Sequence, residues 1–248
     1  MNITGNTILI TGGGSGIGRA LAEAFYAKGN QVIIAGRRQA LLEEVTTANP
    51  GMKSVVFDIE KTDLIPSFAQ KLKTDYPRLN VVIHNAGIMR AESLLEGKIA
   101  DAEATLATNL LGPISLNAAL LPFLVAQPHA AIMTVSSGLA FIPLAATPTY
   151  CATKAAIHSY TQSLRHQLKE TSVQVLELVP PYVQTELMGA GQAIDPNAMP
   201  LQDFIAESMS ILETSPETTE IYVERVKPLR FAEVNANYPA MFERLNSH

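Results

Sequence analysis

Short apolar runs alternate with longer amphipathic stretches along most of the chain. The first apolar run, residues 7–10, is rich in β-branched side chains and too short for a helix, so it predicts a buried strand. Residues 19–28 are strong helix formers with apolar positions at helical spacing. Gly29 and Asn30 end that helix, and residues 31–35 form a second apolar run. The pattern predicts a strand, a turn, a helix and another strand.

The same alternation continues toward the C-terminus. It predicts further strands and helices, the strands at residues 54–57, 81–83, 130–135, 172–179 and 222–223, and the helices at residues 39–47, 59–75, 101–121 and 150–169. Regular alternation of this kind is typical of a parallel sheet wound in both directions. We therefore predict the α/β class: a single-domain Rossmann fold with about seven strands and helices on both faces, over residues 1–248.

Two segments depart from this regular pattern. Asn109, followed by Gly112 and Pro113, predicts a kink in the helix over residues 101–121 that frees backbone carbonyls. Residues 184–201 are rich in glycine and proline and interrupt the alternation, so we expect a flexible lid over a pocket. The alternative for that segment is a disordered surface loop.

A glycine-rich turn joins the first strand to its helix. Its sequence from Thr11 is Thr-Gly-Gly-Gly-Ser-Gly-Ile-Gly. Glycines permit a tight turn, and the helix N-terminus offers free N–H groups to a pyrophosphate. The turn therefore predicts a dinucleotide site rather than a purely structural turn. The expected contacts are Gly12, Gly14, Ser15, Gly16, Ile17 and Gly18.

Arg37 and Arg38 follow the second strand, where a dinucleotide-binding unit places the residue that contacts the adenosine ribose. Proteins that bind NAD usually have an acidic side chain there, whereas a guanidinium matches a 2′-phosphate in charge and geometry. We therefore predict NADP(H) as the cofactor, with NAD(H) less favoured. The alternative is that both arginines merely flank an exposed helix start.

The next two strands also end in candidate contacts. Asp58, with Ile59, ends the third strand and is expected either to hold the adenine amino group or to cap a helix. The fourth strand is followed by Asn85, Ala86 and Gly87, small residues that let a cofactor approach the backbone. His84 beside them is interpreted as a core residue rather than a ligand.

Tyr150 and Lys154 lie one helical turn apart, so they share a helix face. A nearby ammonium favours the phenolate and lowers the pKa of a tyrosine, whose ordinary value is about 10. Tyr150 can then exchange a proton with a substrate oxygen while a nicotinamide exchanges a hydride with the adjacent carbon. Ser137, at the end of the neighbouring strand, is placed to bond the same oxygen. The alternative is an ordinary helix-surface pair.

Together these motifs resemble the short-chain dehydrogenase/reductase family, in particular a bacterial subgroup of oxidoreductases without an established substrate. The resemblance implies a catalytic tetrad of Asn109, Ser137, Tyr150 and Lys154, in which Lys154 also binds the nicotinamide ribose and Asn109 holds a relay water. The family spacing selects Ser137 over Ser136. It also implies a structural role for Asn85 beside the cofactor and cofactor contacts at Pro180, Val183 and Thr185. Pro181 stands where the family usually has glycine, which stiffens that turn.

Composition narrows the possible partners and the compartment. The chain has 248 residues, 47% of them hydrophobic, and a formal net charge of −5, which indicates a globular protein and argues against nucleic acid as a partner. The single cysteine, Cys151, excludes an internal disulfide and a cysteine-based zinc site, and we expect no metal. The chain starts without a signal-like segment, and the apolar stretch 113–135 is interrupted by polar residues and prolines. We expect a cytoplasmic protein with no membrane span.

The expected substrate pocket is apolar. Its candidate wall residues are Met89, Leu139, Phe141, Ile142, Pro181 and Leu187, with no arginine beside the tetrad. We expect a small carbonyl compound or secondary alcohol on a mostly apolar body, contacted by Ser137, Leu139, Tyr150 and Pro181. The alternative places the wall residues in the core. The resemblance also implies pairing of the helices over residues 101–121 and 150–169 across a twofold axis, into a homodimer or homotetramer. Apolar positions at 118–121, Ala155, Ala156, Ile157 and Leu164 give these helices an apolar face, unless they serve the core instead.

The sequence therefore predicts an NADP(H)-dependent oxidoreductase acting on a carbonyl or secondary alcohol. The alternative from another class is a sensor that binds NADP(H) without turnover, which does not need Ser137, Tyr150 and Lys154. Epimerisation or dehydration on the same fold is disfavoured by the glycine spacing and by the short C-terminal region.

Overall fold

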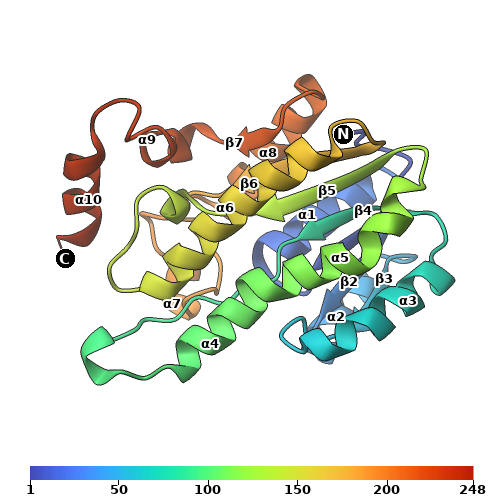
Figure 1. Ribbon diagram of the computed structural model, residues 1–248, viewed down its shortest axis with the longest axis horizontal. Helices are drawn as coiled ribbons and strands as arrows, with labels where there is room; N and C mark the ends of the chain where they lie inside the picture. The colour runs from blue at the N-terminus through green and yellow to red at the C-terminus, as the bar shows by residue number, and fades with distance from the viewer. Residues whose placement is uncertain (248) are drawn as a thin grey trace.

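A seven-stranded parallel sheet forms the centre of the computed structural model, which describes residues 1–247 (Figure 1). Its strands are in the order β3-β2-β1-β4-β5-β6-β7, and every neighbouring pair is parallel. The strands are β1 (Thr7–Thr11), β2 (Gln31–Gly36), β3 (Lys53–Val56), β4 (Leu79–His84), β5 (Ala130–Val135), β6 (Val173–Val179) and β7 (Glu220–Tyr222). The predicted α/β class and strand number are confirmed.

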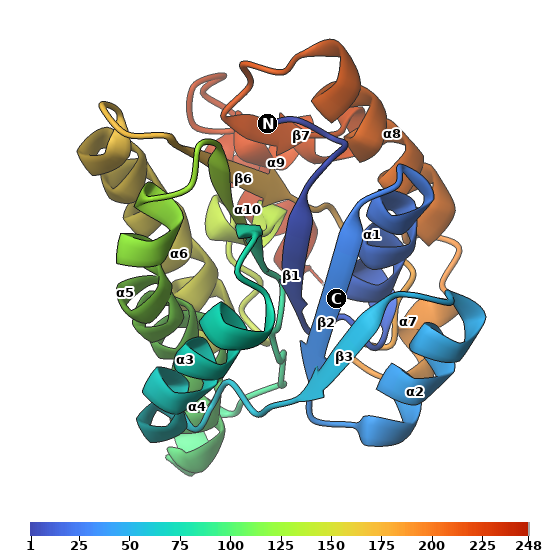
Figure 2. The same cartoon turned by 90° about the vertical axis from the view of Figure 1, so that its right-hand side faces the viewer.

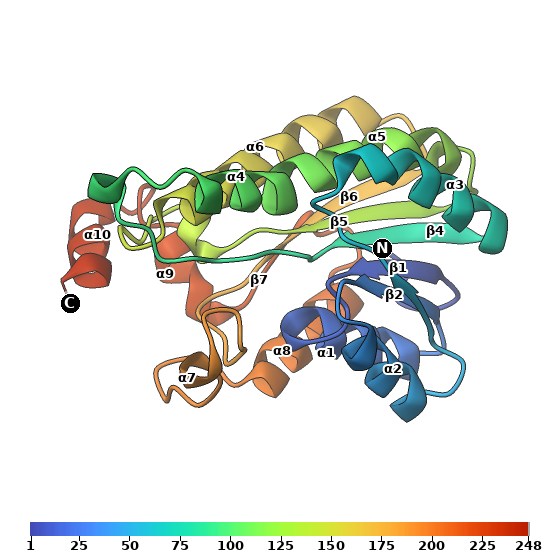
Figure 3. The same ribbon diagram turned by 90° about the horizontal axis from the view of Figure 1, so that it is seen from below.

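Helices cover both faces of the sheet (Figure 2 and Figure 3). One face carries α1 (Gly16–Ala27), α2 (Gln39–Ala48) and α8 (Leu201–Thr214). The other face carries α3 (Ile65–Asp75), α4 (Ala100–Leu106), α5 (Gly112–Val125) and α6 (Pro148–Leu168). The short helices α7 (Ala190–Ala193), α9 (Lys227–Arg230) and α10 (Tyr238–Asn246) belong to the C-terminal part of the chain.

Alternate residues of each central strand pack on opposite faces, because successive side chains of a strand point to opposite sides. In β1, Ile8 and Ile10 join the core cluster that contains Phe204 of α8. Leu9 between them joins the cluster that contains Phe68 of α3 and Leu116 of α5. All of β1 is buried. Burial on both faces explains why the strand is a continuous apolar run.

The chain reverses its direction of winding at β1, which pairs with β2 on one side and with β4 on the other. The connections that leave β1 and β4 therefore run to opposite faces of the sheet. In doubly wound sheets, a crevice forms between such connections at the carboxyl ends of the strands, and ligands bind there.

The structure corrects one predicted helix boundary and the position of one predicted strand. The helix expected from residue 59 begins only at Ile65, after a 3₁₀ turn over Thr62–Leu64, and Pro66 lies in its first turn. Proline lacks the N–H that a position deeper in a helix must donate, so it is tolerated only near the start. The last strand is also shifted, to Glu220–Tyr222 from the predicted 222–223.

The predicted kink lies between α4 and α5. Residues Ala107–Leu111 form a π-helical turn, and Pro113 stands in the first turn of α5. Pro113 has no N–H to donate to the carbonyl of Asn109, so the regular bond of an α-helix cannot form there. A side chain at Gly112 would place its Cβ 2.6 Å from Ile59 Cγ1, so the kinked helix also packs closely on the segment after β3.

The continuous helix Ala100–Val125 is long and apolar enough, by length and composition alone, to cross a membrane. Within the fold, however, its α5 half packs against α3, and Leu116, Leu120 and Leu124 are buried in the core. This is the position of a core helix in an α/β domain. The predicted division of stretch 113–135 into a helix, a turn and a strand is confirmed.

Buried amides join three strands at the edge of the sheet opposite the crevice. The Asn30 Oδ1 accepts hydrogen bonds from Asn6 N (2.9 Å) and Asn6 Nδ2 (3.1 Å), while Asn30 Nδ2 donates to the carbonyls of Ile3 and Phe25, both at 2.8 Å. Asn80 continues the network by donating to Asn6 Oδ1 (3.0 Å). The starts of β1, β2 and β4 are thereby held in register.

Removal of the hydrogen-bond network of Asn6, Asn30 and Asn80 should destabilise the fold without altering the crevice. Asn30→Ala leaves several buried polar groups unsatisfied, so we expect a loss of about 1–3 kcal/mol in the free energy of unfolding. Urea denaturation followed by circular dichroism measures it. Asn235→Ala, at an exposed position, is the control and should change little; equal stability of the two variants would show that the network contributes nothing.

Candidate functional site

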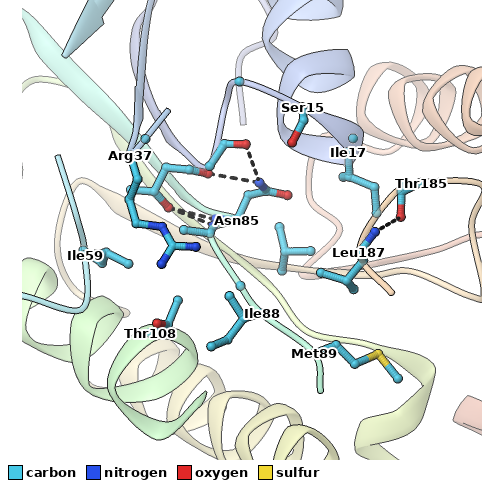
Figure 4. A pocket seen from close by; sticks show the side chains of 18 of the residues that line it. Ser15, Ile17, Arg37, Ile59, Asn85, Ile88, Met89, Thr108, Thr185 and Leu187 are labelled. Carbon is cyan, nitrogen blue, oxygen red and sulfur yellow. Dashed lines mark hydrogen bonds between the residues drawn. The ribbon is translucent and has the colours of Figure 1, made fainter. Parts of the chain in front are cut away.

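A cavity of about 450 Å³ lies at the carboxyl ends of the central strands (Figure 4). Thr11 at the end of β1, Gly36 at the end of β2 and Asn85 after β4 contribute to its lining, together with Ser136 after β5 and Pro180 after β6. These positions lie far apart in sequence, and the parallel sheet brings them to one edge. The cavity occupies the crevice expected at the reversal of winding.

The glycine-rich turn forms one wall of the cavity. Gly12 (φ +70°) and Gly16 (φ +53°) have backbone angles that side chains disfavour. A Cβ on Gly12 would also lie 2.9 Å from Ala86 Cα. Of the predicted contacts in the turn, Gly12, Gly14, Ser15, Gly16 and Ile17 line the cavity. Gly18 lies behind the turn, where a Cβ would approach Asn85 Nδ2 and Gly12 O to 2.3 Å.

Asn85 joins the turn to the loop after β4. Its side-chain Nδ2 donates to the carbonyls of Thr11 (3.0 Å) and Gly12 (3.3 Å). In return the Thr11 hydroxyl accepts from the backbone N–H groups of Asn85 and Ala86, both at 3.1 Å. These bonds fix the cavity wall that Ala86 and Gly87 continue.

Positive charge gathers at the β2 end of the cavity. Arg37 and Arg38 both line it, and Arg38 donates to the Ser15 hydroxyl at 2.8 Å. Figure 4 shows the Arg37 guanidinium extending across the cavity mouth toward Asn85. No carboxylate follows β2 before α2 begins at Gln39. This end is therefore suited to an anionic group.

The third strand supplies the adjoining wall. Asp58 and Ile59 line the cavity, as predicted contacts. Asp58 Oδ1 accepts a hydrogen bond from Glu60 N (3.2 Å), so Asp58 caps a local turn. The alternative that Asp58 caps helix α3 is wrong, because α3 begins at Ile65. Thr108 of the π-helical turn lines the same region, and its buried hydroxyl has no hydrogen-bond partner. Thr108 was not among the contacts predicted from the sequence, where its only signal is its place beside Asn109.

Tyr150 and Lys154 line the opposite part of the cavity from one face of α6. Both are almost fully buried, with 6% and 5% of their surface exposed. Lys154 Nζ donates to the carbonyl of Val135 at 2.7 Å and lies 5.5 Å from the centre of the Tyr150 ring. The last residue of β5 therefore fixes the position of the lysine.

Burial controls the proton affinities of this pair. It lowers the pKa of Lys154 to about 8, and the charge of Glu177 acts against that shift. Burial raises the pKa of Tyr150, and the group that acts against this shift is the Ser137 hydroxyl rather than Lys154. The expected lowering of the tyrosine pKa by the lysine is therefore not among the effects on Tyr150, and desolvation of the phenolate is the largest of them.

Ser137, rather than Ser136, is the serine associated with Tyr150. Ser137 precedes the 3₁₀ turn Gly138–Ala140, and its Oγ accepts from Leu139 N at 3.1 Å. Ser136 lines the cavity, but its hydroxyl is directed at the carbonyl of Leu178 (3.5 Å). The influence of Ser137 on the Tyr150 pKa agrees with the serine chosen by spacing.

Asn109 lies behind the cavity lining and connects three elements. Its amide accepts from Ile88 N and donates to Ile88 O, both at 2.9 Å, and donates to the Thr153 hydroxyl on α6 at 3.2 Å. It therefore positions the loop after β4 against the helix that carries Tyr150 and Lys154. The relay water that the resemblance implies at Asn109 stays a prediction.

The candidate wall residues divide into three groups. Met89 and Leu187 line the cavity, whereas Leu139, Phe141 and Pro181 are half-buried outside its lining. Ile142 is fully buried, so for this residue the core alternative is correct. Arg90 also lines the cavity, and the expectation of no arginine beside the tetrad stays a prediction. Arg90 forms an ion pair with Asp101 of α4.

His84 and Cys151 have the structural positions that the sequence favoured. His84 is buried in the core, its Nε2 is 2.7 Å from Asn117 Oδ1, and burial lowers its pKa to about 4. Cys151 is buried, and burial raises the pKa of its thiol, so it remains a protonated packing residue.

Hydrogen bonds within and next to the segment 184–201 organise it, and Thr185 to Leu187 border the cavity. Val183 pairs with Met199 as an isolated bridge, and Gln192 Nε2 donates to Val183 O (2.8 Å) and to the Thr185 hydroxyl (3.0 Å). Thr185 and Leu187 line the cavity, while Val183 is buried outside its lining.

Comparison with known proteins agrees with this architecture. A family model described as short chain dehydrogenase matches residues 6–193. The uncharacterized oxidoreductase DltE of Bacillus subtilis (strain 168) is 38% identical over 253 residues, covering 100% of this chain and 99% of that protein. A short chain dehydrogenase from Burkholderia cenocepacia J2315, solved in complex with NADP, is 25% identical with a TM-score of 0.83 and covers 99% of both chains. A short chain dehydrogenase/reductase from Burkholderia phymatum, solved in complex with NAD, has the same fold (18% identity, TM-score 0.83, 95% of both chains).

The tight packing behind the glycine-rich turn can be tested directly. In Gly18→Ala the added Cβ must displace Asn85 or the turn itself, so we expect NADPH binding to weaken roughly tenfold or more and stability to fall by about 1–3 kcal/mol. Cofactor fluorescence and thermal melting measure the two effects. Gly191→Ala is the matched control, because no atom lies within 4 Å of a Cβ there. Wild-type binding by Gly18→Ala would contradict the packing argument.

Proposed function

Because the chain belongs to the short-chain dehydrogenase family, we propose that it is an NADP(H)-dependent oxidoreductase acting on a carbonyl or secondary alcohol of a mostly apolar small molecule. The observation that carries the proposal is that Tyr150 and Lys154 line the same cavity as the glycine-rich turn and two arginines. A proton donor and a dinucleotide cradle within one cavity are the two parts that carbonyl reduction requires.

The cavity fits a dinucleotide at several points. The positive φ of Gly12 and Gly16 brings bare backbone to the start of α1, where free N–H groups favour a pyrophosphate. The partnerless Thr108 hydroxyl and Asp58 lie where an adenosine would provide partners. Arg37, Arg38 and Ser15 would hold the 2′-phosphate of NADP(H). When bound, the nicotinamide supplies or accepts the hydride.

Burial raises the pKa of Tyr150, so the phenol is protonated at neutral pH, the form that donates a proton in carbonyl reduction. In this direction the Tyr150 hydroxyl donates a proton to the substrate oxygen, and the Ser137 hydroxyl bonds the same oxygen. Lys154 would bind the nicotinamide ribose and hold a positive charge beside the phenol. In the reverse direction Tyr150 accepts the proton from the alcohol.

The surroundings of the tetrad suggest the substrate class and the assembly. Ile88, Met89 and Leu187 give the cavity an apolar side, which supports a mostly apolar substrate, and residues 184–201 would act as its lid. The proposal includes assembly into a homodimer or homotetramer, through a smaller apolar surface than the one predicted from the sequence. Ile157 and Leu164 are buried in the core, whereas Ala118 and Ala155 are exposed.

The acid–base role is tested by Tyr150→Phe, which removes only the hydroxyl. We expect turnover to fall roughly 100-fold or more while NADPH still binds, because general acid–base catalysis contributes about 10²–10⁴-fold. A panel of carbonyl compounds with NADPH, followed by nicotinamide absorbance, measures the loss. Tyr26→Phe, whose hydroxyl bonds Pro50 O away from the cavity, is the control. Binding of NADPH without turnover of any carbonyl, unchanged in Tyr150→Phe, would instead support a sensor.

Cofactor preference is tested at the arginines. Arg37→Ala and Arg38→Ala each remove a charged contact to the 2′-phosphate, so we expect NADPH binding to weaken roughly tenfold and NADH binding to stay unchanged. Titration calorimetry with both cofactors distinguishes the two effects. Arg78→Ala, at an exposed position away from the cavity, is the control. A wild-type preference for NADH that survives Arg37→Ala would remove NADP(H) from the proposal.

A further inference from the structure

A fully buried carboxylate stands behind the tetrad, and none of the roles described so far uses it. Glu177 lies in the middle of β6, a strand that is otherwise largely apolar, and its side chain has 0% of its surface exposed. Burying a charge is costly unless it is paired and hydrogen-bonded. A buried glutamate at this position therefore requires partners and invites a functional explanation.

Its direct partner is His158, one turn after Lys154 on the same face of α6. His158 Nδ1 lies 2.7 Å and 3.0 Å from the two Glu177 oxygens. The Gln162 amide Nε2 lies 3.2 Å from the other ring nitrogen. The Nδ1–H donates to Glu177, and the Gln162 amide donates to Nε2.

An ion pair lies beside this contact. Glu220 is opposite Glu177 on β7, and Arg230 of α9 donates to its two oxygens at 2.9 Å and 3.2 Å. The Phe141 ring lies between the two pairs, 4.5 Å from the Arg230 guanidinium carbon and 4.8 Å from the His158 ring centre. Arg230 therefore neutralises Glu220, so the charge of Glu177 is available to compensate a different cation.

Glu177 can compensate the positive charge of the Lys154 ammonium. Of the elements packed on α6, β5 offers Lys154 only the Val135 carbonyl, and the π-helical turn offers the uncharged Asn109. On α4, Asp101 is paired with Arg90 and Glu103 is exposed. The loop after β5 contributes the Ser137 hydroxyl beside Tyr150. Among residues 1–247, Glu177 is the carboxylate that raises the pKa of Lys154 against the effect of burial.

We propose that Glu177, held in place by His158, is the counter-charge that keeps Lys154 protonated inside the cavity, and thus a positioning residue for the tetrad. The inference rests on the proposed function for its meaning in catalysis. The geometry behind it is the line of Tyr150, Lys154 and His158 along one helix face, with a buried carboxylate at its end. Glu177 does not touch the reacting atoms and acts through Lys154.

The charge of Lys154 can be measured without any substrate. In protein labelled with ¹³C-lysine, NMR titration should show a lysine with a midpoint near pH 8, identified by its absence in Lys154→Arg. In Glu177→Gln we expect this midpoint to fall by roughly 0.5–1 pH unit or more, because loss of a nearby negative charge disfavours the ammonium. Glu177→Asp, which keeps the charge, should move it back toward the wild-type value.

Controls separate an electrostatic role from a structural one. Glu213→Gln removes a carboxylate that pairs with Lys28 on the other face of the sheet, and it should leave the midpoint unchanged. A lower melting temperature in Glu177→Gln with an unmoved midpoint would overturn the proposal. If Glu177→Gln does not fold, Glu177→Asp decides, since it moves the carboxylate back by one methylene group. The midpoint should then fall by a smaller amount, and no shift would overturn the proposal.

The same titration tests the competing explanation for the cluster. His158, Glu177 and Glu220 also present ligand atoms within 4.8 Å of one another, as a metal site would. A Lys154 midpoint that is the same after dialysis against EDTA and after addition of Zn²⁺ supports the counter-charge. A midpoint that responds to Glu177→Gln only when Zn²⁺ is present, and not after dialysis against EDTA, would overturn it in favour of a metal site. Because no turnover is involved, failure of the proposed enzymatic function leaves this test intact.

Discussion

The close contact between the turn after β1 and the loop after β4 is the constraint on which the site depends. These two segments leave the sheet toward opposite faces, so nothing in the chain's connectivity holds them together. Glycine at positions 12 and 18 removes the side chains that would separate them, and the Asn85 amide then bonds the carbonyls of Thr11 and Gly12. The cavity exists because this contact holds its two walls at a fixed distance.

A second constraint is the cost of placing ionisable groups inside the fold. Tyr150 and Lys154 are buried, and desolvation moves the pKa of each toward its neutral form. Local hydrogen-bond partners compensate part of this cost: the Ser137 hydroxyl for the Tyr150 phenol and the Val135 carbonyl for the Lys154 ammonium. The proton affinities of Tyr150 and Lys154 therefore depend on the residues around them as much as on the pair itself.

Several residues of the site carried no recognisable signal in the sequence. Thr108 and Arg90 look like ordinary helix and loop residues, and only the folded chain brings them to the cavity. Glu177 is the clearest case, because the sequence pattern alone places a single acidic residue of an apolar strand at the surface. Its partners come from α6, β7 and α9, so no local pattern can reveal the cluster.

The sequence by itself determined the parallel α/β sheet, the glycine-rich turn after the first strand, and the pairing of Tyr150 with Lys154. These features depend on periodicity and on backbone freedom, which are properties of neighbouring residues along the chain. Tertiary structure alone decided which groups surround that pair and how strongly burial shifts their pKa values. Those effects depend on distances between segments and on exclusion of water, and both arise only when the sheet and its helices have packed together.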